Sequence, residues 1–150
     1  GLDYRIVRLS NPYGAYQRPN GVLGAVTTFT YKALKNEKIT VYGDGSVVRD
    51  FIYIDDAIKA IVNIGSSECI HRTFNVGYGR GTSILEVLDT IEKSLVIKLS
   101  VEFKAARKVD VPINYLDIGR YEEEFGKLNP ISLYEGVQRT AKFMQEEEMV

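Results

Sequence analysis

The chain has 150 residues, a length typical of one compact domain, and its 45% hydrophobic content is enough to build a core. The formal net charge of −1 excludes a general electrostatic attraction to nucleic acid or to an acidic membrane, and no apolar run predicts a membrane span or a signal peptide. One cysteine, Cys69, excludes an internal disulfide, and a single histidine, His71, leaves too few ligands for a zinc site.

Residues 4–10 predict a strand, and the following Asn11-Pro12-Tyr13-Gly14 predicts a turn. Asn11 stands where the strand is expected to end, and ligands of open α/β sheets bind at the carboxyl ends of strands. The alternative is that Asn11 only starts the turn. A strand so early in the chain leads us to expect that the sequence is a piece of a longer protein.

A helix is expected over residues 22–36, followed by a short strand over 38–42 and a turn at Asp44-Gly45. The segment from Val47 to Ile54 is rich in β-branched and aromatic residues and predicts one continuous strand.

Arg49 lies within this segment, where alternation predicts that it shares a face with Val47, Phe51 and Tyr53 while Asp50 points the other way. A guanidinium on a rigid strand suits a phosphate group, which it can hold through two parallel hydrogen bonds. The alternative is an edge-strand arginine in solvent.

A helix is expected next, capped by Asp55 or Asp56.

Residues 73–76 predict a buried strand, and Gly77-Tyr78-Gly79-Arg80-Gly81-Thr82 follows it. This run superficially resembles a dinucleotide-binding fingerprint, with Glu102 at about the right distance downstream. Because Thr82 stands where the third glycine is required, we interpret the run as a tight connection.

Ser83 and Glu86 fit a capping box for a helix ending near Leu95, and Ser132 with Glu135 fits a second one. Between them, residues 99–103 predict a strand and residues 118–125 a short helix. In the loop that joins these two, Arg107 could hold a phosphate and Asp110 a hydroxyl, and an exposed charged loop is the alternative.

Tyr31 and Lys35 have the Tyr-x-x-x-Lys spacing of a catalytic pair, in which the lysine helps the tyrosine to act as a base. No glycine-rich strand-to-helix turn precedes them, so we interpret both as helix surface.

Several segments together resemble the C-terminal part of the extended short-chain dehydrogenase/reductases, the NAD-dependent epimerase/dehydratase family, and among these most closely the UDP-glucose 4-epimerases. The segments that carry this resemblance are residues 8–14, 39–56, 74–77, 107–110 and 132–136. They occur in the order and spacing of the family across nearly the whole chain.

The resemblance implies an α/β fold: a substrate-binding domain spanning residues 1–150, with the last strands of the Rossmann sheet at 1–14. It further implies that the N-terminal NAD-binding half and its catalytic Tyr-x-x-x-Lys pair are absent. We therefore expect the fragment itself to be inactive, and the full-length enzyme to be a cytoplasmic homodimer that uses NAD.

The resemblance also implies the substrate-binding residues. Asn11 would bind the phosphates of a UDP-sugar, Arg49 and Arg107 would clamp the diphosphate, and Asp110 would accept hydrogen bonds from the ribose. Leu23 would lie beside the diphosphate, where a backbone amide can donate. The uracil would be read by the backbone of Thr40, Val41 and Tyr42, with the Tyr42 ring against the base.

The implied reaction interconverts UDP-glucose and UDP-galactose through a 4-keto intermediate. The alternatives are the same part of a nucleotide-sugar 4,6-dehydratase or UDP-glucuronate decarboxylase, and a stand-alone nucleotide-binding module without chemistry.

Overall fold

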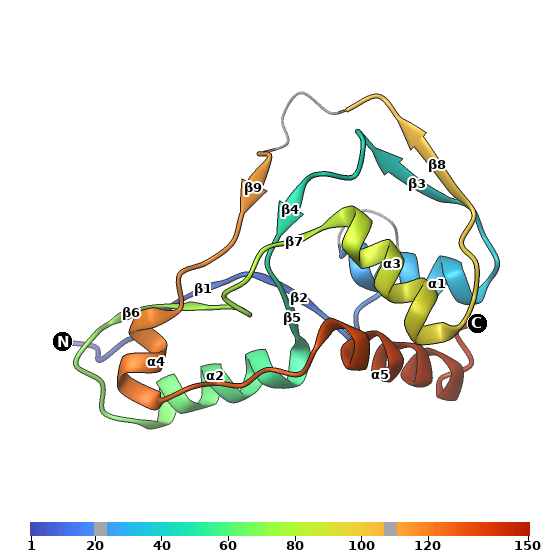
Figure 1. Cartoon of the computed structure of the whole chain (residues 1–150). Helices are drawn as coiled ribbons and strands as arrows, with labels where there is room; N and C mark the ends of the chain where they lie inside the picture. Colours follow the sequence, from blue (N-terminus) through green and yellow to red (C-terminus); the bar gives the residue numbers. More distant parts are fainter. Residues whose placement is uncertain (20–23, 107–110) are drawn as a thin grey trace.

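The computed structural model spans residues 1–150 and describes residues 1–19, 24–106 and 111–150 (Figure 1). The expectations for Leu23, Arg107 and Asp110 lie outside the described residues. The helices are α1 (Ala25–Leu34), α2 (Ile54–Ser66), α3 (Ile84–Leu95), α4 (Gly119–Phe125) and α5 (Leu133–Glu146). The strands are β1 (Ile6–Leu9), β2 (Asn11–Tyr13), β3 (Ile39–Tyr42), β4 (Val48–Arg49), β5 (Phe51–Tyr53), β6 (Thr73–Val76), β7 (Thr82–Ser83), β8 (Val101–Lys104) and β9 (Ile113–Asn114).

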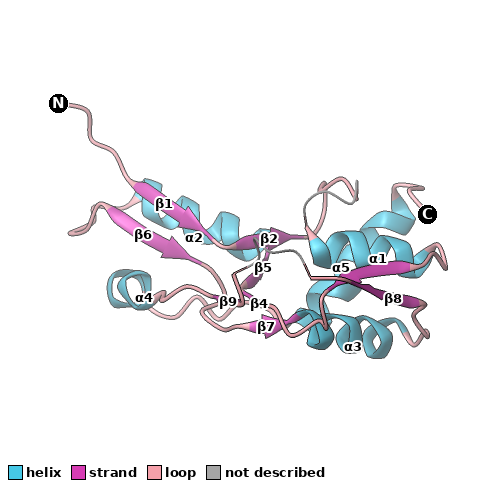
Figure 2. Cartoon of the chain, turned by 90° about the horizontal axis from the view of Figure 1, so that it is seen from above, coloured by secondary structure: helices cyan, strands magenta, loops and turns pink. Residues whose placement is uncertain are grey.

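These elements gather at two ends of the molecule (Figures 1 and 2). Near the N-terminus, α2 and α4 lie beside the parallel pair β1–β6. At the other end, α1 and α3 lie beside the parallel pair β3–β8, and α5 packs against both of these helices. Between them β2 pairs in parallel with β5, and β4 pairs with both β7 and β9. The alternation of short parallel strands with helices confirms the expected α/β class.

Each end has its own buried core. At the N-terminal end, Ile52 and Phe74 pack with Ala57 of α2 and Tyr121 of α4. At the other end, Tyr13 of β2 packs among α1, α3 and α5, through the side chains of Val26, Val87 and Val137. Ile39 and Val41 of β3 pack on Leu88 of α3. Because β5 contributes Ile52 to the first core and Phe51 and Tyr53 to the second, it joins the two ends.

The expected continuous strand from Val47 to Ile54 is wrong, because the strand breaks at Asp50. The carboxylate of Asp50 is buried and accepts backbone N–H groups from Tyr78 (2.8 Å), Gly79 (3.1 Å) and Leu116 (3.3 Å). β4 and β5 therefore have different partner strands on either side of Asp50. The break brings three distant segments of the chain to one buried carboxylate.

The expected start of α2 is also wrong. The helix begins at Ile54 after Tyr53, which has no capping side chain, and Asp55 and Asp56 lie within its first turn. The carboxylate of Asp56 instead accepts the backbone N–H of Ile131 at 3.0 Å. Acidic residues in this turn still complement the positive end of the helix dipole.

The turn expected at Asn11-Pro12-Tyr13-Gly14 begins later in the structure. Asn11, Pro12 and Tyr13 form β2 and pair with Phe51, Ile52 and Tyr53 of β5. Gly14 follows with a φ of +135°, a conformation that glycine adopts without strain.

The predicted capping box at the start of α3 is confirmed. The hydroxyl of Ser83 accepts the N–H of Glu86 while the Glu86 carboxylate accepts the N–H of Ser83, which completes a capping box. At the second predicted box, which precedes α5, only the serine half is formed: the Ser132 hydroxyl accepts the N–H of Glu135 at 3.2 Å, and the Glu135 carboxylate accepts from Arg139 instead. Among the described residues, no helix is both long and apolar enough to cross a bilayer.

Replacing Gly136 with alanine is expected to destabilise the fold, although alanine favours helix. An added Cβ would lie 2.0 Å from the hydroxyl oxygen of Tyr13, whose ring is buried. Overpacking costs about 1–3 kcal/mol, while the helix propensity gain is about 1 kcal/mol, so we expect a net loss of up to about 2 kcal/mol. Urea unfolding measures this difference.

Gly65→Ala is the matched control, because no atom lies within 4 Å of the added Cβ and Gly65 is also helical. It should raise the free energy of unfolding by about 0.5 kcal/mol. Equal effects of the two substitutions would show that the contact with Tyr13 does not limit packing.

Candidate functional site

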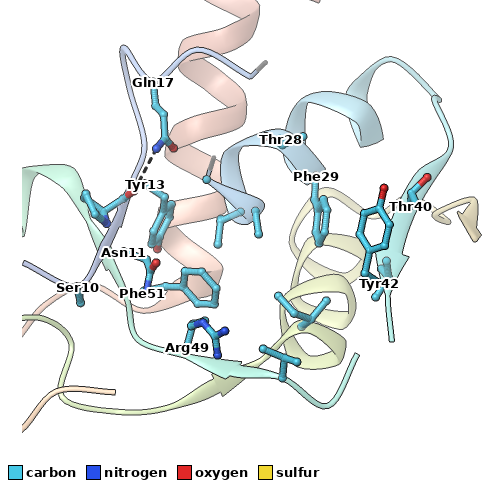
Figure 3. A pocket seen from close by; sticks show the side chains of 17 residues that line it. Ser10, Asn11, Tyr13, Gln17, Thr28, Phe29, Thr40, Tyr42, Arg49 and Phe51 are labelled. Atoms are coloured by element: carbon cyan, nitrogen blue, oxygen red, sulfur yellow. Dashed lines mark hydrogen bonds between the residues drawn. The ribbon is translucent and has the colours of Figure 1, made fainter. Parts of the chain in front are cut away.

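A cleft of about 630 Å³ opens where β2 ends, α1 begins and β3 and β4 run alongside (Figure 3). This volume lies within the range of small-molecule sites in proteins. The residues predicted from the sequence that line it are Asn11, Thr40, Val41, Tyr42 and Arg49. Three separate segments of the chain thus bring five of the eight predicted residues to one cleft, and the other three lie outside the described residues.

Asn11 is held at the end of β1 and the start of β2 by one carbonyl group. Its backbone N–H and its Nδ2 group both donate to the Asp50 carbonyl oxygen, at 3.0 Å and 2.9 Å. The amide nitrogen carries two hydrogens, so one remains available to a ligand in the cleft. The buried Asp50 therefore fixes the direction of the Asn11 side chain.

Arg49 contributes a positive charge to the cleft. Its Nη1 group donates to the carbonyl oxygens of Val48 (2.8 Å) and Val111 (2.6 Å), which fixes the guanidinium plane. No described carboxylate forms an ion pair with it, and its Nε and Nη2 groups have no partner among the described residues. An anion that enters the cleft would meet two parallel N–H donors, the geometry that suits phosphate.

The backbone of β3 offers hydrogen-bonding groups on one edge. The amides of Ile39 and Gly43 donate to β8, at 2.8 Å each. Amides alternate along a strand, so those of Thr40 and Tyr42 point to the opposite edge, which borders the cleft. β8 is the only strand that pairs with β3 in the part of the chain that the structure describes. This edge can recognise a flat ligand that has donors and acceptors in its plane.

Two aromatic side chains line the same part of the cleft. Phe29 comes from α1 and Tyr42 from β3, and both lie on the side away from Asn11 in Figure 3. The Tyr42 side chain is 42% exposed, so its ring is accessible. An aromatic ring beside a strand edge suits a heterocyclic base, which stacks and forms hydrogen bonds at once.

Tyr13 also lines the cleft, but it is not a candidate base. Burial, and to a smaller extent the nearby Tyr53, Asp56 and Tyr78 groups, raise the pKa of its hydroxyl far above the ordinary tyrosine value. The hydroxyl stays protonated at neutral pH, and the Cα of Gly136 lies against it. Tyr13 is therefore a wall of the cleft.

Sequence reasoning missed three polar residues of the cleft, Ser10, Gln17 and Thr28. The Ser10 hydroxyl is buried and has no hydrogen-bond partner among the described residues. Its place next to Asn11 in the sequence was a usable signal, because both follow directly on β1. Gln17 stands in a polar loop without periodicity, where nothing local distinguishes it from a solvated glutamine.

The glycine run at 77–81 is confirmed as a tight connection. Added Cβ atoms would lie 2.6 Å from Asp50 at Gly77, 2.8 Å from Ile118 at Gly79 and 2.5 Å from Val48 at Gly81. The space beside these glycines is filled by side chains of the protein itself, so it does not fit a dinucleotide pyrophosphate.

Other candidate chemistry does not converge on the cleft. Tyr31 and Lys35 lie on α1 and at its end, with the Lys35 Nζ atom 5.8 Å from the Tyr31 ring centre, and neither lines the cleft. This agrees with their interpretation as helix surface. No group of three or more metal-ligating side chains occurs among residues 1–19, 24–106 and 111–150.

Comparisons with known proteins identify relatives of this chain. It is 32% identical over 144 residues to a UDP-glucose 4-epimerase of Mycolicibacterium smegmatis, which covers 96% of this chain and 46% of the relative. Further relatives are named UDP-glucuronate 4-epimerase, UDP-glucuronic acid decarboxylase and dTDP-glucose 4,6-dehydratase. The chain spans about half the length of the curated relatives that it matches.

Solved structures have the same fold. The crystal structure of a Thermotoga maritima UDP-glucose 4-epimerase with UDP-glucose matches with a TM-score of 0.89 and 32% identity, over 98% of this chain and 47% of that one. A Thermus thermophilus UDP-glucose 4-epimerase in complex with NAD matches with a TM-score of 0.81 and 26% identity, over 93% of this chain and 45% of that one.

The model of the NAD dependent epimerase/dehydratase family matches residues 1–77, which carry β1 to β6 and most of the cleft walls. With this match and relatives named above over nearly the full chain, we conclude that the chain belongs to the NAD dependent epimerase/dehydratase family.

Proposed function

We propose that this chain is the C-terminal, nucleotide-sugar-binding part of a UDP-glucose 4-epimerase, and that it holds the UDP-sugar in the cleft between β2, α1, β3 and β4. The observation that carries the proposal is the meeting, in one cleft, of Arg49, for which the described residues supply no counter-ion, and of residues 40–42 of β3. The cation matches the diphosphate of a nucleoside diphosphate, and the backbone groups of the strand match its base.

The proposed binding mode assigns a task to each wall. Arg49 and the second amide hydrogen of Asn11 would hold the diphosphate, with Leu23, Arg107 and Asp110 completing the grip on the diphosphate and ribose. The backbone of Thr40, Val41 and Tyr42 would read the edge of uracil. The Tyr42 ring would cover the face of the base, as aromatic side chains do at nucleotide sites.

The family is described as NAD dependent, and NAD when bound accepts and returns a hydride. The glycine run at 77–81 does not fit this cofactor, because neighbouring side chains fill its space. We propose that the NAD site lies in the half of the relatives' length that this chain does not span. The task of this chain is then to position the sugar nucleotide.

A decarboxylase or dehydratase acting on a related nucleotide sugar is a second candidate, because relatives of 27–28% identity carry those names. The substrate-binding part is shared in this proposal, and the reaction is decided elsewhere. Product analysis of a full-length enzyme carrying this sequence separates the candidates.

Calorimetric titration of the chain tests the binding proposal. We expect saturable binding of UDP-glucose and of UDP, and none of glucose 1-phosphate, which lacks the nucleoside that the β3 edge would read. Binding of glucose 1-phosphate as strong as that of UDP would contradict the proposal. Added NAD should produce no interconversion of UDP-glucose and UDP-galactose by the chain alone, and measurable turnover would refute the assignment of chemistry to another part.

A further inference from the structure

Gln17 makes contacts on both sides of the cleft entrance. Its Nε2 group donates to the carbonyl oxygen of Pro12 in β2 at 3.3 Å. Its Oε1 atom accepts a short hydrogen bond from the hydroxyl of Thr27 in α1. Thr27 is fully buried, and its hydroxyl also accepts the N–H of Gly14 at 3.4 Å. One side-chain amide therefore connects β2 with the first turn of α1, and Figure 3 draws its bond to β2.

The same amide lies directly against the start of α1. An added Cβ at Gly24 would lie 2.7 Å from both the Nε2 and the Oε1 atoms of Gln17, and Gly24 has a φ of +80°. Gly24 is the residue that precedes α1, and no side chain caps this helix. The positive φ favours glycine at position 24, and glycine has no side chain that could accept the first amides of α1.

The position of this helix start matters for the cleft. Gly24, Ala25 and Val26 line the cleft on one side, and Asn11 of β2 lines it on the other. The first turn of a helix carries a partial positive charge and attracts phosphate. The separation between the helix start and the strand end decides whether one diphosphate can contact both.

We propose that Gln17 is a positioning residue that holds the first turn of α1 at the correct distance from β2 for the diphosphate, an inference that depends on the proposed function. The role needs a donor and an acceptor on one neutral group, which glutamine supplies. Methionine matches the length of glutamine without either group. Glutamate would keep an acceptor but would add a negative charge beside the phosphate.

The test is the affinity of the chain for UDP and for uridine, measured by NMR titration for wild type and Gln17→Met. Because Gln17 acts on the diphosphate wall, the dissociation constant for UDP should rise about tenfold, the upper range for one lost hydrogen bond, while that for uridine changes less than about twofold. Gln17→Glu should weaken UDP binding more than Gln17→Met.

Gln138→Met is the matched control, since its Nε2 group donates to the Ser94 carbonyl oxygen at 3.4 Å, joining α5 to α3 outside the cleft. It should change neither affinity. An unchanged UDP affinity in Gln17→Met, or equal losses for UDP and uridine, would overturn the positioning role. If wild type itself does not prefer UDP over uridine, the proposed function fails, and the positioning role fails with it.

Discussion

Replacing Asp50 with asparagine is expected to lower the free energy of unfolding of the chain by about 3 kcal/mol, the upper range for a buried group that leaves its partners unsatisfied. The Asp50 side chain is 1% exposed, and both of its oxygens accept backbone N–H groups. In asparagine, an NH₂ group replaces one of these oxygens. This NH₂ group can only donate, so it cannot accept the buried backbone N–H that the oxygen accepts in wild type.

The amide has no good orientation at this position. With the nitrogen in the Oδ2 place, the N–H groups of Gly79 and Leu116 both lose their acceptor. With the nitrogen in the Oδ1 place, Tyr78 loses its acceptor instead. Rotation is hindered, because Gly77 already approaches Asp50 so closely that a Cβ there would lie 2.6 Å from Oδ2.

Equilibrium urea unfolding of wild type and Asp50→Asn measures the effect. Asp89→Asn is the matched control, because Asp89 is exposed and forms an i,i+4 ion pair with Lys93 at 2.7 Å. Such surface pairs contribute about 0.3–0.5 kcal/mol. A loss at Asp50 no larger than at Asp89 would contradict its role as the buried junction of three segments.

Replacing Arg49 with methionine is expected to weaken the binding of UDP-glucose by about 1.5–3 kcal/mol, or roughly 10- to 150-fold. The guanidinium donates to two backbone carbonyl groups, and the Arg49 side chain lines the cleft. Methionine keeps the apolar stem and removes the charge. Arg49→Lys should have an intermediate affinity, since an ammonium group retains the charge but not the paired donors.

Calorimetry with UDP-glucose measures these affinities, and Arg80→Met supplies the control. The Arg80 side chain is 69% exposed, forms an ion pair with Glu86 at 3.4 Å and does not line the cleft. Arg80→Met should bind like wild type. Equal dissociation constants for the Arg49 and Arg80 variants would exclude a role of Arg49 in holding the diphosphate.

Elements with local signals could be predicted from the sequence. The capping box of Ser83 and Glu86 marked the start of α3, and the short helix expected over residues 118–125 matches α4. β3 was found because its short run of β-branched residues is bounded by turn residues. In each case the determining contacts lie within a few residues of one another, so the local pattern contains them.

The errors have a common physical origin in contacts between distant segments. The break at Asp50 depends on N–H groups of residues 78, 79 and 116, and the role of Asp56 depends on the N–H of Ile131. The apparent turn after Asn11 became a strand because β5 pairs with it. Local periodicity carries no information on such partners.

For the candidate site, too, residues in recognisable motifs could be predicted, and residues that depend on distant contacts could not. Asn11, Thr40, Val41, Tyr42 and Arg49 could be named because their motifs resemble a known family, and they line one cleft. Gln17 could not be named, because its importance comes from its contacts with Pro12, Gly24 and Thr27. These contacts exist only after the strand and the helix have packed together.

Titration of the isotope-labelled chain with UDP-glucose, followed by backbone amide chemical shifts, tests the central claim most directly. We expect the largest shift changes around Asn11, along Thr40 to Tyr42 and at Arg49, with one dissociation constant for all of them. Saturable changes confined to residues far from this cleft, or no saturable change at all, would contradict its assignment as the nucleotide-sugar site.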